Sequence, residues 1–280
     1  MIKSILDYLL TLHPVLLGLL GSTFTWFTTA FGAGAVFFFR KVDNKVMDAM
    51  LGFSAGIMIA ASFFSLIQPA IERAEELGYI TWIPAVFGFL VGAFFIYIVD
   101  VFVPDLDKLT FIDEDLTKHG KKDFLLFTAV TLHNFPEGLA VGVAFGALAS
   151  NPDIQTLVGA MLLTLGIGIQ NIPEGAAISL PLRRGNVDLI KCFNYGQMSG
   201  LVEIVGGLMG AYAVYSFTRI LPFALAFSAG AMIYVSIEQL IPEAKRKDID
   251  NKVPSIFGVI GFTLMMFLMF HWVELSKIYH

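Results

Sequence analysis

Long apolar stretches follow one another along the whole chain, separated by short polar joints. A helix needs about 20 mainly apolar residues to cross the hydrocarbon core of a bilayer. Eight stretches of the 280-residue chain reach that length, at about 11–39, 49–71, 81–103, 123–149, 156–181, 188–217, 220–242 and 253–275. The sequence therefore predicts an all-α polytopic membrane protein with eight transmembrane helices, in which residues 1–280 form a single transmembrane domain.

The composition agrees with a membrane protein and excludes several other classes. Hydrophobic residues make up 56% of the chain and charged residues only 15%, which is roughly half the charge of an average soluble protein. The formal net charge of −5 argues against a nucleic-acid partner, which would require a basic face. The single cysteine, Cys192, cannot form an internal disulfide.

The basic residues predict how the chain is oriented in the membrane. Of the 18 Lys and Arg residues, 14 lie in the joints between spans 1 and 2, 3 and 4, 5 and 6, and 7 and 8. Short cytoplasmic loops carry such an excess of basic residues. We therefore expect both termini to be extracytoplasmic and the 104–122 loop to be cytoplasmic. In a prokaryote the location would be the plasma (inner) membrane.

Two segments of the chain are repeated, and the first repeat relates spans 2 and 7. Residues 53–59 (FSAGIMI) recur as residues 227–233 (FSAGAMI), and Ser62 and Leu66 match Ser236 and Leu240 in the same register. With the predicted orientation, span 2 and span 7 cross the membrane in opposite directions. Inverted repeats are typical of transporters, in which they supply conformations open to either side.

The second repeat contains the chain's most polar membrane residues. Residues 133–138 (HNFPEG) in span 4 are followed 37 residues later by residues 170–175 (QNIPEG) in span 5. His133 and Glu137 are four residues apart and share a helix face, as do Gln170 and Glu174. Both segments lie near the middle of their spans, and the same order of Asn, Pro, Glu and Gly is hard to attribute to coincidence in a chain with so few polar membrane residues.

Three carboxylates in the predicted spans require a cation, a proton or a water-filled cavity, because an ionised carboxylate in hydrocarbon is costly. They are Glu137, Glu174 and Glu203. Pro136 and Pro173 cannot donate a backbone hydrogen bond, so each releases a carbonyl oxygen of the preceding turn. Carboxylates, amides and a freed carbonyl together indicate a cation site. For Glu203 alone, a protonated glutamate in a structural hydrogen bond remains an alternative.

The ligand types narrow the choice of metal. One imidazole with several carboxylates suits zinc and its first-row neighbours better than magnesium or calcium. We expect zinc first, with iron, manganese and cadmium close behind, and no catalytic cofactor. Carboxylate ligands bind metal in the deprotonated form, so binding should release protons and depend on pH. The alternative for His133 is a core histidine whose ring only donates a hydrogen bond to a backbone carbonyl.

The chain resembles the ZIP family of divalent-metal transporters, and within it the GufA-like branch. The resemblance is carried by residues 133–138 (HNFPEG), 170–175 (QNIPEG) and 199–203 (SGLVE). It implies eight spans in a 3+2+3 arrangement, with spans 1–3 and 6–8 as inverted repeats. It also implies zinc uptake toward the cytoplasm through a centre of two adjacent metal ions, and an elevator motion of spans 1, 4, 5 and 6 against spans 2, 3, 7 and 8.

The same resemblance implies a ligand set. The first metal site would use Met58, His133, Glu137, Gln170 and Glu174. The second would use Asn134, Asn171 and Glu203, with Glu137 and Glu174 bridging both ions. Asp100 and Glu238 would line the exit path toward the cytoplasm. Some family members carry an acidic residue in place of Asn171 or a histidine in place of Gln170, and both departures reduce the charge or strength of the ligands.

Other functions fit the sequence less well. Residues 52–56 (GFSAG) match the nucleophile-elbow pattern of hydrolases, but that pattern requires a strand-to-helix turn, whereas this segment lies inside a span. A zinc metalloprotease would need two histidines on one helix. We therefore expect that the protein is not an enzyme.

A metal channel or a structural metal-binding protein is an alternative that the sequence leaves open. The spacing of Gly88 and Gly92 is compatible with a homodimer. The 104–122 loop, with His119 as its one histidine, is expected to be a solvated linker.

Overall fold

The fold is seen in a computed structural model that describes residues 2–39, 43–106, 121–184, 187–245 and 250–278. Within these ranges the side chains of residues 2–3, 102–106, 121–130, 133 and 272–278 are not described. Nearly all of the described residues are helical, and none of them lies in a strand. The predicted all-α class is confirmed. Most of the predicted 104–122 loop lies outside the described residues.

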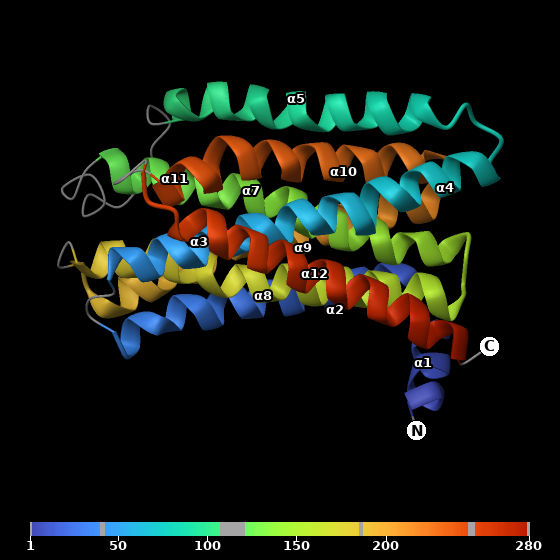
Figure 1. The fold of residues 1–280 in the computed structure, drawn as a ribbon, viewed down its shortest axis with the longest axis horizontal. Coiled ribbons are helices and arrows are strands. Elements are labelled where there is room, and N and C mark those ends of the chain that lie inside the picture. The colour runs from blue at the N-terminus through green and yellow to red at the C-terminus, as the bar shows by residue number, and fades with distance from the viewer. Residues whose placement is uncertain (1, 40–42, 107–120, 185–186, 246–249, 279–280) are drawn as a thin grey trace.

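The helices follow the predicted spans closely, with short 3₁₀ or π segments between some of them (Figure 1). The α-helices are α1 (Ile2–Leu10), α2 (Pro14–Ala33), α3 (Asn44–Ala61), α4 (Gln68–Glu76), α5 (Trp82–Leu106), α7 (Lys121–Gly146), α8 (Ile154–Arg184), α9 (Leu189–Ser216), α10 (Leu221–Val235), α11 (Ile241–Lys245) and α12 (Val253–Ile278). The short segments are η1 (Gly34–Phe37), η2 (Ser62–Ile67), η3 (Ala147–Ala149), η4 (Thr218–Ile220) and η5 (Ser236–Leu240).

Seven stretches of the described residues are long and apolar enough to cross a membrane, and each coincides with a predicted span. The remaining predicted span, 123–149, coincides with helix α7, part of whose side chains lie outside the described residues. The structure therefore supports a protein that crosses the membrane several times.

The first predicted span differs from the structure at its start. The long helix begins at Pro14, where the ring of His13 accepts a hydrogen bond from the amide of Val15 at 3.3 Å. Proline suits the first turn of a helix because its missing N–H has no partner there in any case. Residues 2–10 form the separate amphipathic helix α1, which is too short to span a bilayer. A search for stretches of about 20 apolar residues does not detect such a short helix.

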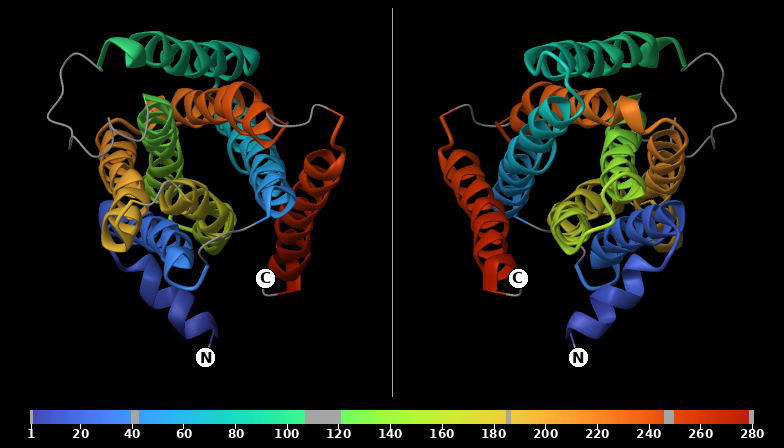
Figure 2. Two further views of the ribbon diagram at one scale, coloured as in Figure 1. Left: turned by 90° about the vertical axis from the view of Figure 1, so that its left-hand side faces the viewer. Right: turned by 90° about the vertical axis from the view of Figure 1, so that its right-hand side faces the viewer.

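The long helices pack into two groups (Figure 2). Helices α2, α7, α8 and α9 contact one another extensively and form what we call the central bundle. The second group, which we call the outer arc, contains α3, α4, α5, α10, α11 and α12, with its closest packing between α3 and α12 and between α10 and α5. Contact between the two groups is made mainly by α3 against α8 and by α10 against α7.

The repeat of spans 2 and 7 is visible in the local backbone. Helix α3 passes into the π segment η2 at Ser62, and helix α10 passes into the π segment η5 at Ser236. Each serine donates a hydrogen bond to the carbonyl four residues before it, Ser62 to Met58 at 2.8 Å and Ser236 to Met232 at 2.9 Å. Matching sequences have thus produced the same rare change of helix type.

The packing of the repeats extends the match beyond the repeated sequence. A Cβ at Gly56 of α3 would collide with the carbonyl of Gly258 in α12, and one at Gly230 of α10 with the carbonyl of Phe89 in α5. The reverse also holds: a Cβ at Gly261 of α12 would collide with the carbonyl of Phe53, and one at Gly92 of α5 with the carbonyl of Phe227. Helices α5 and α12 therefore occupy corresponding places, although their sequences show no obvious similarity.

Candidate metal centre

The three predicted carboxylates come from three adjacent helices of the central bundle. Glu137 lies on α7, Glu174 on α8 and Glu203 on α9, and at most 1% of each residue is exposed. Helices α7 and α9 approach very closely, since a Cβ at Gly138 would collide with the backbone of Glu203. Both α7 and α8 remain helical through Pro136 and Pro173. The central bundle therefore holds three acidic side chains out of contact with solvent.

Glu137 and Gln170 form the first hydrogen-bonded pair of the site. The amide nitrogen of Gln170 donates to Oε1 of Glu137 at 2.6 Å. Among the described residues, Oε2 of Glu137 and Oε1 of Gln170 have no hydrogen-bond partner. Buried polar atoms usually have partners, so these two oxygens are available as ligands for a cation.

Glu203 and Asn171 form the second pair. Oε2 of Glu203 accepts from the amide nitrogen of Asn171 and Oε1 accepts from the hydroxyl of Thr29, both at 2.9 Å. The same amide nitrogen lies 3.3 Å from the carbonyl of Thr25. A carbonyl only accepts hydrogen bonds, so this contact fixes the amide nitrogen on that side. The oxygen of Asn171 has no partner among the described residues.

Asn134 repeats this pattern on α7. Its amide nitrogen donates to the backbone carbonyl of Ser199 in α9 at 3.0 Å, and its oxygen has no partner among the described residues. Asn134, Gln170 and Asn171 are all fully buried. In each of these amides the nitrogen donates a hydrogen bond within the protein, and the oxygen has no partner among the described residues. An amide oxygen in this state can bind a cation.

Glu174 lies within electrostatic reach of both other glutamates. Three carboxylates packed together in a buried site repel one another and need a compensating positive charge. Among the described residues, no three His, Cys, Asp or Glu side chains have the spacing to hold a metal ion by themselves. Within the described part of the chain, a metal site here would need amide oxygens as well as carboxylates. His133 belongs to α7, but its side chain lies outside the described part.

Met58 lies on α3 of the outer arc, close to where that helix packs against α8. The hydroxyl of Ser54 in α3 donates to the backbone carbonyl of Gln170 in α8 at 3.0 Å, so α3 packs against α8 at the level of the site. Met58 lies one turn further along α3 and is fully buried. Ile57, the neighbour of Met58, approaches Gly166 of α8, so this turn of α3 lies about one turn before Gln170 along α8.

Comparison with known proteins identifies the family. The sequence model described as ZIP zinc transporter matches residues 110–269, which include all three glutamates of the site. The chain is 39% identical to zinc transporter ZIP11 of Xenopus tropicalis, over 91% of this chain and 97% of that protein. The chain belongs to the ZIP family.

Two bacterial ZIP relatives are similar over nearly the same range. Zinc transporter GufA of Myxococcus xanthus is 32% identical over 90% of this chain and 97% of its own length. Zinc transporter ZIPB of Bordetella bronchiseptica is 33% identical over 89% of this chain and 79% of its own length. The resemblance seen in residues 133–138, 170–175 and 199–203 is therefore confirmed over most of this ZIP protein.

Helix α2 contributes polar residues to the site that sequence reasoning did not assign. Thr29 donates to Glu203, and the carbonyl of Thr25 accepts from Asn171. Ser22, Thr25 and Thr29 are fully buried on a helix that contacts α7, α8 and α9. Their spacing of three and four residues places them on one helix face, and that periodicity is the signal by which they could have been found.

Asp100 and Glu238 lie away from these helices, in the outer arc. Oδ1 of Asp100 in α5 accepts from the amide nitrogen of Gln239 in η5 at 3.1 Å, next to Glu238. Glu238 itself is exposed. The structure thus brings the two predicted exit-path carboxylates to one place in the arc, separate from the three central glutamates.

The hydrolase alternative has no support in this ZIP protein. Residues 52–56 lie inside α3, and Ser54 donates its hydroxyl hydrogen to a helix carbonyl, so the segment lacks the strand-to-helix turn of a nucleophile elbow. The relatives that the chain resembles are named transporters rather than enzymes. The family and the apolar helices together make this a multi-pass membrane protein.

Proposed function

We propose that this ZIP protein transports divalent transition-metal ions, zinc first, toward the cytoplasm. The observation that carries the proposal is the cluster of three buried glutamates and three buried amides on α7, α8 and α9. An apolar bundle that only had to be stable would gain nothing from three neighbouring carboxylates. A metal cation supplies the positive charge that this cluster lacks. The relatives named zinc transporters favour zinc, and iron, manganese and cadmium are further candidate substrates.

The ligands fall into two hydrogen-bonded groups, which supports a binuclear centre. The Glu137–Gln170 pair would serve the first ion, with Glu174, His133 and Met58. The Asn171–Glu203 pair would serve the second, with Asn134. Glu137 and Glu174 would bridge the two ions. Each pair leaves acceptor oxygens without a hydrogen-bond partner among the described residues.

The membrane arrangement follows the predicted topology, with eight spans in a 3+2+3 order and both termini extracytoplasmic. Helix α1 and the end of α12 lie at the same end of the molecule, as an even number of spans requires (Figure 1). Basic residues then place the opposite end in the cytoplasm. In a prokaryotic cell, uptake into the cytoplasm would occur across the plasma membrane.

Alternating access, of the elevator type, is the proposed mechanism. The central bundle contains the candidate metal ligands apart from Met58, and the outer arc contacts it mainly through α3 and α10. These two helices carry the repeated sequence, so the bundle is flanked by two similar surfaces. A metal channel would keep the same ligands, but its flux would exceed carrier rates and would not saturate at low zinc concentration.

The experiment that tests the function is radioactive zinc uptake into proteoliposomes containing the purified chain. We expect saturable uptake that competing iron and manganese reduce, and that is lost when His133→Ala is combined with Glu174→Ala. Glu72→Gln is the matched control, because Glu72 is an exposed carboxylate whose side chain accepts from Gln68. Absent uptake by the folded wild-type chain, or full uptake by the double variant, would contradict the proposal.

A further inference from the structure

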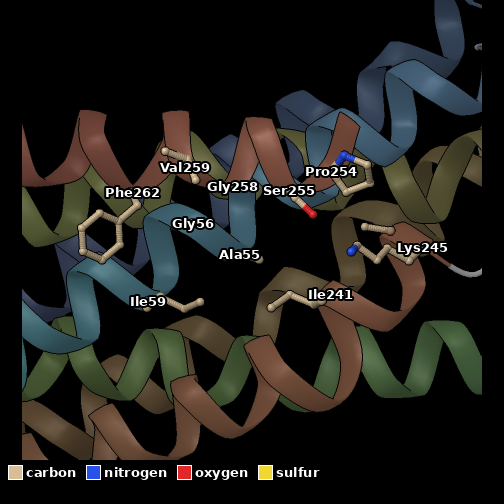
Figure 3. A pocket seen from close by; sticks show the side chains of 12 residues that line it. Ala55, Gly56, Ile59, Ile241, Lys245, Pro254, Ser255, Gly258, Val259 and Phe262 are labelled. Atoms are coloured by element: carbon tan, nitrogen blue, oxygen red, sulfur yellow. The ribbon is translucent and has the colours of Figure 1, made fainter. Parts of the chain in front are cut away.

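The outer arc contains a lateral groove that the proposed transport path does not use. It lies between α3, α11 and α12 and has a volume of about 310 Å³. Its walls are apolar, with Ala55 and Ile59 from α3, Ile241 from α11 and Val259 and Phe262 from α12 (Figure 3). Ile241 and Val259 are exposed, so the groove opens on the outer surface of the molecule, where a bilayer would surround it.

One end of the groove is polar. Figure 3 shows the ammonium of Lys245 and the hydroxyl of Ser255 at the end near Pro254, whereas Ile59 and Phe262 lie at the other end. Lys245 is half-buried and forms no ion pair with any described residue. An ammonium group beside apolar walls requires an anion or access to water. The groove therefore combines a site for a hydrocarbon chain with two hydrogen-bond donors at its end.

The repeat provides an internal comparison. A second apolar groove of about 340 Å³ lies between η2, α4 and α5, and its lining residues, apart from Trp82, occupy positions that correspond to lining positions of the first. Ile67 corresponds to Ile241 and Leu90 to Val259, but Ile71 stands in the place of Lys245 and Val86 in the place of Ser255. Helix packing in this fold therefore does not require the lysine or the serine, and the polar end is specific to one groove.

We propose that the groove between α3, α11 and α12 binds an anionic phospholipid. One acyl chain lies along the apolar walls, and the phosphate accepts hydrogen bonds from Lys245 and Ser255. The polar end lies at the end of the molecule that the proposed topology places in the cytoplasm, and the cytoplasmic leaflet is the one rich in anionic lipids. The apolar counterpart faces the other leaflet. Lipid binding itself does not depend on metal transport.

Native mass spectrometry of the purified full chain tests the proposal. The probes are phosphatidylglycerol and phosphatidylcholine with identical acyl chains. The decisive variant combines Lys245→Ile with Ser255→Val, which copies the apolar counterpart. We expect wild type to retain phosphatidylglycerol preferentially, and the double variant to bind it about fivefold or more weakly, since one lysine contributes on the order of a fivefold preference for anionic lipid. Phosphatidylcholine has the same phosphate but a choline that offsets its charge, so its binding should weaken less than that of phosphatidylglycerol.

A matched control separates the groove from the general surface charge. Lys252 is an exposed lysine of the same joint and does not line the groove, so Lys252→Ile should leave the lipid preference unchanged. Equal weakening by Lys252→Ile, or undiminished phosphatidylglycerol binding by the double variant, would overturn the proposal. Displacement of the lipid by millimolar inorganic phosphate would also overturn it, because the acyl chain would then contribute nothing. Thermal unfolding of each variant confirms that it is folded.

Discussion

At the scale of single residues, Glu137 combines a buried charge with an unused acceptor oxygen. Glu137→Gln keeps the shape of the side chain and the hydrogen bond from Gln170 but removes the charge. We expect zinc uptake to fall by more than the roughly 10–100-fold that an outer-shell partner costs. The midpoint of thermal unfolding without metal should stay the same or rise, because one of three mutually repelling carboxylates has been neutralised.

Uptake into proteoliposomes and calorimetric zinc titration check this prediction together. Glu72→Gln is again the control, since it removes an exposed carboxylate without touching the bundle. Full uptake by the Glu137→Gln protein would rule out a bridging carboxylate at this position. A drop in both uptake and thermal stability would indicate a structural role instead.

Asn171 gives a second prediction at this scale, because it is both a candidate ligand and the donor to Glu203. Asn171→Asp adds a charged ligand and removes the N–H group that donates a hydrogen bond to Glu203. Zinc should bind more tightly and leave more slowly, whereas the metal-free protein should be less stable. Calorimetry and metal-free thermal unfolding measure the two effects. Unchanged zinc affinity would show that Asn171 does not contact the metal.

At the scale of elements, the close contact between α7 and α9 sets the distance between Glu137 and Glu203. A methyl group at Gly138 would meet the backbone of Glu203, so Gly138→Ala must force the helices apart. We expect a loss of about 1–3 kcal/mol in the free energy of unfolding, typical of overpacking. Zinc affinity should fall as well, because the ligands separate.

Gly159 offers a matched control for this helix contact. It lies in α8, and no atom of another described helix lies within 4 Å of the position that its Cβ would occupy. Gly159→Ala should be neutral or stabilise the protein by up to about 1 kcal/mol, because alanine favours helix more than glycine does. Unfolding by denaturant in detergent compares the two variants. Equal effects would show that α7 and α9 are not held at this distance.

At the scale of the whole molecule, the proposed mechanism requires the central bundle to move against the outer arc. Arg184 at the end of α8 donates to Asn44 at the start of α3 at 2.9 Å, so this contact joins the two groups. Asn251 donates to Asp48 at 3.2 Å, and both of these residues belong to the arc side. The two contacts allow cross-linking between the groups to be compared with cross-linking within one group.

We expect a thiol cross-linker to stop zinc uptake in N44C/R184C and to leave uptake largely intact in D48C/N251C. Both variants are made with Cys192→Ser, so that the native thiol cannot react. Uptake before cross-linking shows whether the substitutions themselves matter. If the cross-linked N44C/R184C protein transports zinc at the wild-type rate, motion between bundle and arc is not part of the cycle.

Several features of this protein could be predicted because they depend on local sequence. A run of about 20 apolar residues must form a membrane helix wherever it packs, since its backbone groups have no other partners in lipid. The repeated motifs likewise pointed to Glu137 and Glu174 without any knowledge of packing. Helix α1 was not predicted because it is short, and its amphipathic pattern is not detected by a measure of apolar length.

The sequence alone was sufficient to predict the all-α class, the apolar spans that coincide with helices in the structure, and the residues proposed for the metal centre. Which helices are neighbours could be seen only in the folded protein. The role of Thr25 and Thr29, the correspondence between α5 and α12, and the groove ending at Lys245 all depend on contacts between segments far apart in the chain. Helix formation satisfies hydrogen bonds within each segment, whereas packing in a membrane depends on side-chain shape between segments.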